Sequence, residues 1–217
     1  MNDNKPILFE IRAARARHPA AVDDRLVSVI VPAYNEGVVL ENCIRSLLAS
    51  EHGRLEIVIV DDGSTDDTAE VIRRLELLDE RVTGISKPNA GKGAALNTGV
   101  RASTGDVLLF IDADGILLPR TIPELLRGLD GPRVGAACGD DHPVNLGRAQ
   151  VQLLALLSHV GTGMVRRALT LLRCLPIVSG SIGAFPRAVV EEVGGLDETT
   201  VGEDLELTWR VRRAGYD

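Results

Sequence analysis

Val107-Leu108-Leu109-Phe110-Ile111-Asp112-Ala113-Asp114 is an apolar run that ends in two acids. Five consecutive apolar residues are typical of a strand buried on both faces of a parallel sheet. Open α/β sheets bind ligands beyond the carboxyl ends of such strands, where both acids stand. Two neighbouring carboxylates repel each other unless a cation lies between them, and such oxygen ligands suit magnesium or manganese. An ordinary turn is the alternative, because Asp114-Gly115 is common turn chemistry.

The first half of the chain alternates between strand-like and helix-like segments. Apolar runs predict strands at residues 26–31, 55–60, 82–86 and 107–111. Helical spacing of apolar or small residues predicts helices between them, near residues 39–48, 66–78 and 92–102. We expect Pro32 to end the first strand. The alternation predicts an α/β fold with a mostly parallel central sheet and helices on both faces.

Past residue 115 the alternation is less regular. The pattern predicts, in order, a helix near 121–129, a short strand at 134–138, an amphipathic segment at 147–173, an extended segment at 177–185 and a final helix from about Glu203. Residues 1–25 are polar and are expected to form a short helix or an arm outside the core. No internal repeat or linker is evident, so we expect one domain over residues 26–217.

Composition excludes some function classes. The chain has 217 residues, is 45% apolar and 25% charged, and carries a formal net charge of −7, which is ordinary for a globular protein and unfavourable for binding nucleic acid. The cysteines Cys43, Cys138 and Cys174 are few, widely spaced and odd in number, which favours reduced thiols in the cytoplasm.

No apolar run reaches the roughly 18 residues of a membrane span. In the longest candidate, residues 151–172, the charged or polar side chains of His159, Arg166 and Arg167 interrupt the apolar sequence. We expect an amphipathic core helix there, and a helix lying at a membrane surface is the alternative.

Four further motifs stand where a predicted strand ends or a helix begins. Each has an ordinary alternative as a turn, a loop or a helix cap. Free N–H groups at a helix start suit an anion, and a carboxylate there can act as a general base. The motifs are Val31-Pro32-Ala33-Tyr34-Asn35-Glu36, Val60-Asp61-Asp62-Gly63-Ser64-Thr65-Asp66, Lys87-Pro88-Asn89-Ala90-Gly91-Lys92-Gly93 and Gly202-Glu203-Asp204.

Taken in order with Asp112-Ala113-Asp114, these motifs resemble the inverting family-2 glycosyltransferases of the A-type fold. The resemblance covers about residues 26–217 and implies a nucleotide-sugar half at 26–115 and an acceptor half at 116–217. It also implies transfer of a sugar from a nucleotide-diphosphate sugar, with UDP as the expected nucleotide, to a hydroxyl of a saccharide acceptor. A divalent ion, magnesium or manganese, is the implied cofactor.

The resemblance also implies a role for each motif. Asp112 and Asp114 would hold the metal, and Asp204 would be the catalytic base. The residues implied to contact the nucleotide sugar are Pro32, Ala33, Tyr34, Glu36, Asp61, Asp62, Gly91, Lys92, Asp112 and Ala113, with Asp62 the stronger candidate for the base. The residues implied to lie near the acceptor are Ser179, Gly180, Ser181 and Glu203.

A narrower likeness is to the membrane polysaccharide synthases of this family, which make poly-N-acetylglucosamine, chitin, hyaluronan or cellulose. It rests on residues 177–185 and 201–210. Those synthases carry a downstream Gln-x-x-Arg-Trp motif and flanking membrane helices that this sequence lacks. We therefore expect a C-terminally truncated catalytic domain from the cytoplasm, or from the cytoplasmic face of the inner membrane if the full protein is anchored there.

Two other functions remain open at the level of sequence. A truncated or inactive module could bind a nucleotide sugar without transferring it. A nucleotidyltransferase shares the broad architecture, but it is expected to carry a Gly-rich, basic loop after the first strand, where this chain has Pro32 to Glu36.

Overall fold

The computed structural model describes residues 9–12, 23–143, 152–153, 156–157, 160, 165–171 and 177–217. The strands are β1 Phe9–Arg12, β2 Val27–Ala33, β3 Leu55–Asp61, β4 Val82–Ser86, β5 Val107–Ile111, β6 Gly115–Leu117, β7 Ala137–Cys138, β8 Asp140–Pro143 and β9 Ile182–Pro186. The helices are α1 Leu40–Leu48, α2 Thr68–Leu78, α3 Lys92–Ala102, α4 Thr121–Gly128, α6 Arg166–Leu171, α7 Arg187–Glu192 and α8 Glu203–Arg213.

Within the described residues, the central sheet has six strands in the order β4-β3-β2-β5-β9-β7. The first four are parallel to one another. β9 then runs antiparallel to β5, with Ile182 opposite Ile111, and β7 runs antiparallel to β9. The predicted α/β fold with a mostly parallel sheet is therefore confirmed.

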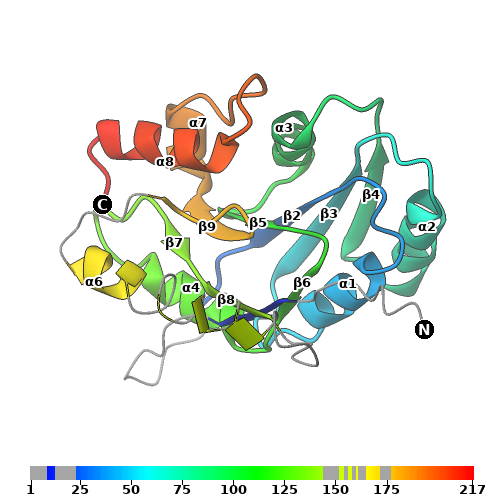
Figure 1. Ribbon diagram of the computed structural model, residues 1–217, viewed down its shortest axis with the longest axis horizontal. Coiled ribbons are helices and arrows are strands. Elements are labelled where there is room, and N and C mark those ends of the chain that lie inside the picture. The colour runs from blue at the N-terminus through cyan, green and yellow to red at the C-terminus, as the bar shows by residue number, and fades with distance from the viewer. Residues whose placement is uncertain are drawn as a thin grey trace.

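Helices cover both faces of this sheet, because alternate strand residues point to opposite sides. Val29, Ile57 and Leu109 point toward α1, α2 and α4. Ile30, Val58 and Leu108 belong to the second core, which α3, α7 and α8 complete. Figure 1 shows α3, α7 and α8 together on one side of the sheet and α1 and α4 on the other.

A small second sheet was not predicted from the sequence. β1 lies between β6 and β8, parallel to β6 and antiparallel to β8. The described part of residues 1–25 thus includes a strand, and the predicted short helix is wrong for residues 9–12. Strand pairing with segments more than 100 residues away is a non-local effect, which local sequence patterns do not report.

Three predicted boundaries also differ. β2 continues through Pro32 to Ala33. β5 pairs only with residues 27–30 of β2, so the N–H that Pro32 lacks is not needed for a hydrogen bond to β5. Only Ala137–Cys138 of the predicted strand at 134–138 is a strand, and within 177–185 the strand begins only at Ile182.

Most of the predicted amphipathic segment at 147–173 lies outside the described residues, which include α6 from it. Among the helices that the structure describes, none combines the length and apolar character needed to cross a bilayer. Cys43 is a buried free thiol, Cys138 is half-buried, and Cys174 is outside the described residues.

Candidate active site

The topology brings the predicted motifs to one edge of the central sheet. β2, β3, β4 and β5 are parallel, so their carboxyl ends share that edge. β9 runs the opposite way, and it therefore starts at the same edge. The Asp112 N–H lies 3.4 Å from the Ser181 carbonyl oxygen that it bonds. The reversed strand thus places the Ser179-Gly180-Ser181 loop beside Asp112.

Side chains join the loop after β2 to the loop after β3. Asn35 has φ of 58°, its side-chain oxygen accepts a hydrogen bond from the Thr65 N–H at 2.8 Å, and its own N–H donates to Ser64 Oγ at 2.9 Å. The Glu36 N–H donates to Thr68 Oγ1 at 2.9 Å. These bonds hold the turn that carries Tyr34, which is half exposed, and Glu36.

Asp61 and Asp62 are both buried, and each fixes a loop. Asp61 Oδ1 accepts from the Ser64 N–H at 2.9 Å. Asp62 forms an ion pair with Lys87 and accepts from the Gly91 N–H at 2.8 Å. Through Lys87 and Gly91, the Asp62 carboxylate therefore holds the loop that leads into α3.

Lys92 links the donor motifs to the acceptor motifs. It is the first residue of α3, directly after Gly91, whose φ of +92° is one that glycine adopts without strain. Its ammonium nitrogen lies 2.5 Å from Asp112 Oδ1, 3.5 Å from the Gly180 carbonyl oxygen and 3.7 Å from Glu203 Oε1. One cation thus contacts groups from the turn after β5, from the loop before β9 and from α8.

Asp204 contacts Gly180 as well, through the Gly180 N–H rather than its carbonyl oxygen. It lies in the first turn of α8, and its Oδ2 accepts a hydrogen bond from the Gly180 N–H at 3.0 Å. A Cβ atom at Gly180 would come within 2.9 Å of that oxygen, so a larger residue there would displace the Asp204 carboxylate. Ser179 and Ser181 bond to each other through their hydroxyl oxygens at 2.7 Å.

The electrostatics mark this edge as a place for a cation. Burial raises the pKa of Glu36, and the charges of Asp114 and Asp112 raise it further. Burial acts to lower the pKa of Lys92, but the negative charge of Asp112 and its hydrogen bond outweigh burial, so that pKa is raised. Burial raises the pKa of the Cys43 thiol beneath Asp112, which makes it a core group rather than a nucleophile.

The residues present fit a divalent ion that arrives with phosphates. Among the described residues, no group of three His, Cys, Asp or Glu side chains could hold a metal. Magnesium is usually bound by one or two carboxylates together with substrate phosphates and water, and Asp112 and Asp114 are the two carboxylates that would hold it here. The predicted turn is present as well, because the Gly115 N–H donates to the Asp112 carbonyl oxygen at 3.0 Å. The turn and a metal site are therefore compatible.

The predicted residues fall into two connected groups. Asp112, Lys92, Gly180, Glu203 and Asp204 form one group through the contacts above. The turn residues after β2, with Asp61 and Asp62, form the second. The Ala113 side chain is buried in the core, which leaves its backbone for any contact with a ligand.

The sequence pattern assigned no role to two supporting residues. Lys87 opens the motif at residues 87–93, but its ion pair with Asp62 was not predicted. Ser86, the residue before Lys87, stands opposite Asp61 in the β3–β4 register, which brings Lys87 near Asp62. Thr208 is buried within α8, and its hydroxyl contacts both Asp204 and Val178. Nothing in the local sequence distinguishes it from an ordinary helical threonine.

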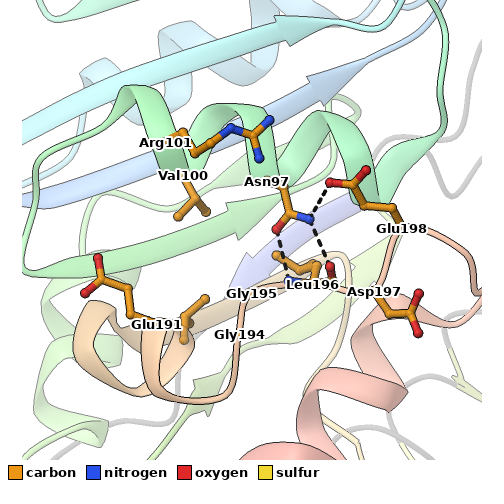
Figure 2. A pocket seen from close by; sticks show the side chains of 10 residues that line it. Asn97, Val100, Arg101, Glu191, Gly194, Gly195, Leu196, Asp197 and Glu198 are labelled. Atoms are coloured by element: carbon orange, nitrogen blue, oxygen red, sulfur yellow. Dashed lines mark hydrogen bonds between the residues drawn. The ribbon is translucent and has the colours of Figure 1, made fainter.

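An open hollow lies elsewhere, between α3 and the loop at residues 194–198 (Figure 2). Asn97 crosses it, accepting from the Leu196 N–H at 2.9 Å and donating to Glu198 Oε1 at 2.8 Å. None of the predicted site residues lines this hollow, so we do not assign the reaction to it.

Sequence comparisons agree with the motifs. The family model described as "Glycosyl transferase family 2" matches residues 28–194. "Poly-beta-1,6-N-acetyl-D-glucosamine synthase" from Staphylococcus aureus is 28% identical over 214 residues, which cover 95% of this chain and 51% of that protein. "Probable glycosyltransferase YdaM" from Bacillus subtilis is 33% identical over 201 residues, which cover 88% of this chain and 47% of that protein. The chain thus spans about half the length of these relatives.

Solved structures give the same fold. A mannosyltransferase from Pyrobaculum calidifontis, in complex with GDP-mannose and Mn²⁺, superposes with a TM-score of 0.69 at 25% identity, over 98% of this chain and 57% of that one. Glucosyl-3-phosphoglycerate synthase from Mycobacterium tuberculosis gives a TM-score of 0.61 at 22% identity, over 94% of this chain and 74% of that one, and supports the fold alone. Because the family model covers more than half of the sequence, the chain belongs to glycosyl transferase family 2.

Proposed function

We propose that this domain transfers a sugar from a nucleotide-diphosphate sugar to a hydroxyl of a saccharide acceptor, with inversion at the anomeric carbon. One observation carries the proposal. Lys92 contacts Asp112 and the Gly180 carbonyl oxygen, and the N–H of Gly180 donates to Asp204. The groups proposed to hold the leaving diphosphate and the proposed base thus both contact Gly180, the first through its carbonyl oxygen and the second through its N–H.

The donor is expected to bind along the ends of β2, β3 and β5. Tyr34 and Glu36, with Asp61 and Asp62 behind them, would contact the base and ribose. Lys92, at the start of α3, would attract the diphosphate, as helix starts and lysines do. UDP is the proposed nucleotide. The likeness to a poly-β-1,6-N-acetyl-D-glucosamine synthase supports a saccharide product.

The chemistry needs a base and a stabilised leaving group. Asp204 would remove the proton from the acceptor hydroxyl, whose oxygen would attack the anomeric carbon from the face opposite the departing diphosphate. A divalent ion held by Asp112 and Asp114 would neutralise charge on that diphosphate, and the Mn²⁺ present with GDP-mannose in the Pyrobaculum enzyme supports this assignment. Ser179, Gly180, Ser181 and Glu203 would border the acceptor.

A donor screen tests the function. Thermal unfolding is followed with uridine, guanosine and thymidine diphosphate sugars, each with and without manganese, beside an assay for nucleoside diphosphate release onto oligosaccharide acceptors. We expect one donor to raise the melting temperature in a metal-dependent way, since a ligand that binds only the folded state stabilises it. No shift with any donor would contradict the proposal. A shift without release would favour the binding module that does not catalyse.

A further inference from the structure

Thr208 joins the acceptor-side loop to the helix that carries Asp204. Its hydroxyl accepts a hydrogen bond from the Val178 N–H at 3.0 Å and donates to the Asp204 carbonyl oxygen at 2.7 Å. The bond to the carbonyl four residues earlier is common for a helical threonine. The bond from Val178 is not local, because that residue is 30 positions away in the sequence.

This junction is closed to water. Thr208 and Val178 are each only 4% exposed, and Val178 belongs to the hydrophobic core that α8 completes. A buried N–H needs a hydrogen-bond partner, and the Val178 N–H donates to the hydroxyl of Thr208. The Thr208 hydroxyl therefore fixes the position of Val178, at the start of the loop, relative to α8.

Two residues further along the same loop, Gly180 meets the candidate base. Its N–H donates to Asp204 Oδ2, and its carbonyl oxygen is the one that Lys92 approaches. The loop thus touches α8 at two points, at Thr208 through Val178 and at Asp204 through Gly180. Moving the first contact would move the second.

We propose that Thr208 is a positioning residue for the transfer reaction. It holds residues 178–180 against the start of α8, so that the Gly180 N–H fixes the orientation of the Asp204 carboxylate. This inference rests on the proposed function of Asp204. It predicts that loss of the hydroxyl slows the transfer step but leaves donor binding intact, because the donor motifs lie on β2, β3, β5 and α3.

The test compares Thr208→Val, which keeps the shape but removes the hydroxyl, with Thr208→Ser, which keeps the hydroxyl. Thr98→Val is the matched control, since Thr98 makes the same kind of bond to Ala94 within α3 at 2.8 Å but holds no loop of the site. For each variant we would measure kcat, KM for the donor, and the hydrogen-exchange rate of the Gly180 amide by NMR.

We expect Thr208→Val to lower kcat about tenfold or more with KM for the donor within about twofold, and to speed exchange at Gly180. Thr208→Ser should restore both readouts, and Thr98→Val should move neither. A Thr208→Val variant with normal kcat and normal exchange at Gly180 would overturn the inference. If the unmodified protein transfers no sugar, the proposed function fails, and the exchange rates still decide whether Thr208 holds the loop.

Discussion

At the scale of single residues, the ammonium group of Lys92 connects the donor motifs to the acceptor motifs. Lys92 lies within 4 Å of the carboxylates of Asp112, directly after β5, and of Glu203 on α8, and 3.5 Å from the Gly180 carbonyl oxygen. The motif pattern identified Lys92, Asp112 and Asp204 because each follows a strand or opens a helix. It did not reveal that Asp62 pairs with Lys87, or that Gly180 bonds Asp204, because these contacts depend on how distant loops meet.

Asp112→Asn tests the metal assignment. An amide lacks the negative charge that a hard cation prefers, so we expect the affinity for Mn²⁺ in the presence of a nucleoside diphosphate to fall at least about tenfold, or about 1.4 kcal/mol. Isothermal titration calorimetry measures it. Asp130→Asn, an exposed acid paired with Arg25, is the control and should bind as the unmodified protein does. Unchanged Mn²⁺ affinity in Asp112→Asn would refute the assignment.

At the scale of elements, α3 approaches the sheet closely because it carries small residues. Gly99 is buried in α3, and a Cβ atom placed there would come within 2.3 Å of Ile30 Cγ2 on β2. The sequence predicted this helix correctly at residues 92–102 from its small residues. It could not predict the distance of approach, which determines where Lys92 stands at the start of the helix.

Gly99→Ala is therefore expected to destabilise the protein. The added methyl group would force α3 away from β2, at a cost of about 1–3 kcal/mol for overpacking. Urea unfolding gives the free energy of unfolding directly. Gly53→Ala is the matched control, since a Cβ at Gly53 meets nothing within 4 Å. Equal stability of both variants would show that the helix has room that the structure does not indicate.

At the scale of the whole molecule, the reversed strand β9 completes the site. Local patterns predicted the parallel strands β2, β3, β4 and β5 well, because β2, β3 and β5 are short apolar runs and the weaker β4 stands between two predicted helices. They did not predict that β9 returns antiparallel beside β5, since that pairing joins residues more than 70 positions apart. Arg187, directly after β9, secures the return by donating to the Gly105 and Val100 carbonyl oxygens.

Arg187→Met should loosen this attachment. The variant keeps much of the apolar stem but leaves the carbonyl oxygens and Ser103 Oγ without the guanidinium, so we expect a loss of about 1–3 kcal/mol in the free energy of unfolding. Guanidinium unfolding of Arg187→Met and of Arg213→Met, an exposed arginine at the end of α8, measures the difference. If both changes cost the same, the bonds of Arg187 contribute no particular stability.

The central claim is that Asp204 is the base of a sugar transfer, and Asp204→Asn tests it most directly. The measurement is the rate of transfer from the best donor of the screen, beside the dissociation constant for that donor, with Glu70→Gln as a control that neutralises an exposed acid in the first turn of α2. We predict that Asp204→Asn lowers the transfer rate about 10²–10⁴-fold with the donor constant within about twofold, and that Glu70→Gln changes neither. Transfer by Asp204→Asn at the rate of the unmodified protein would contradict the account.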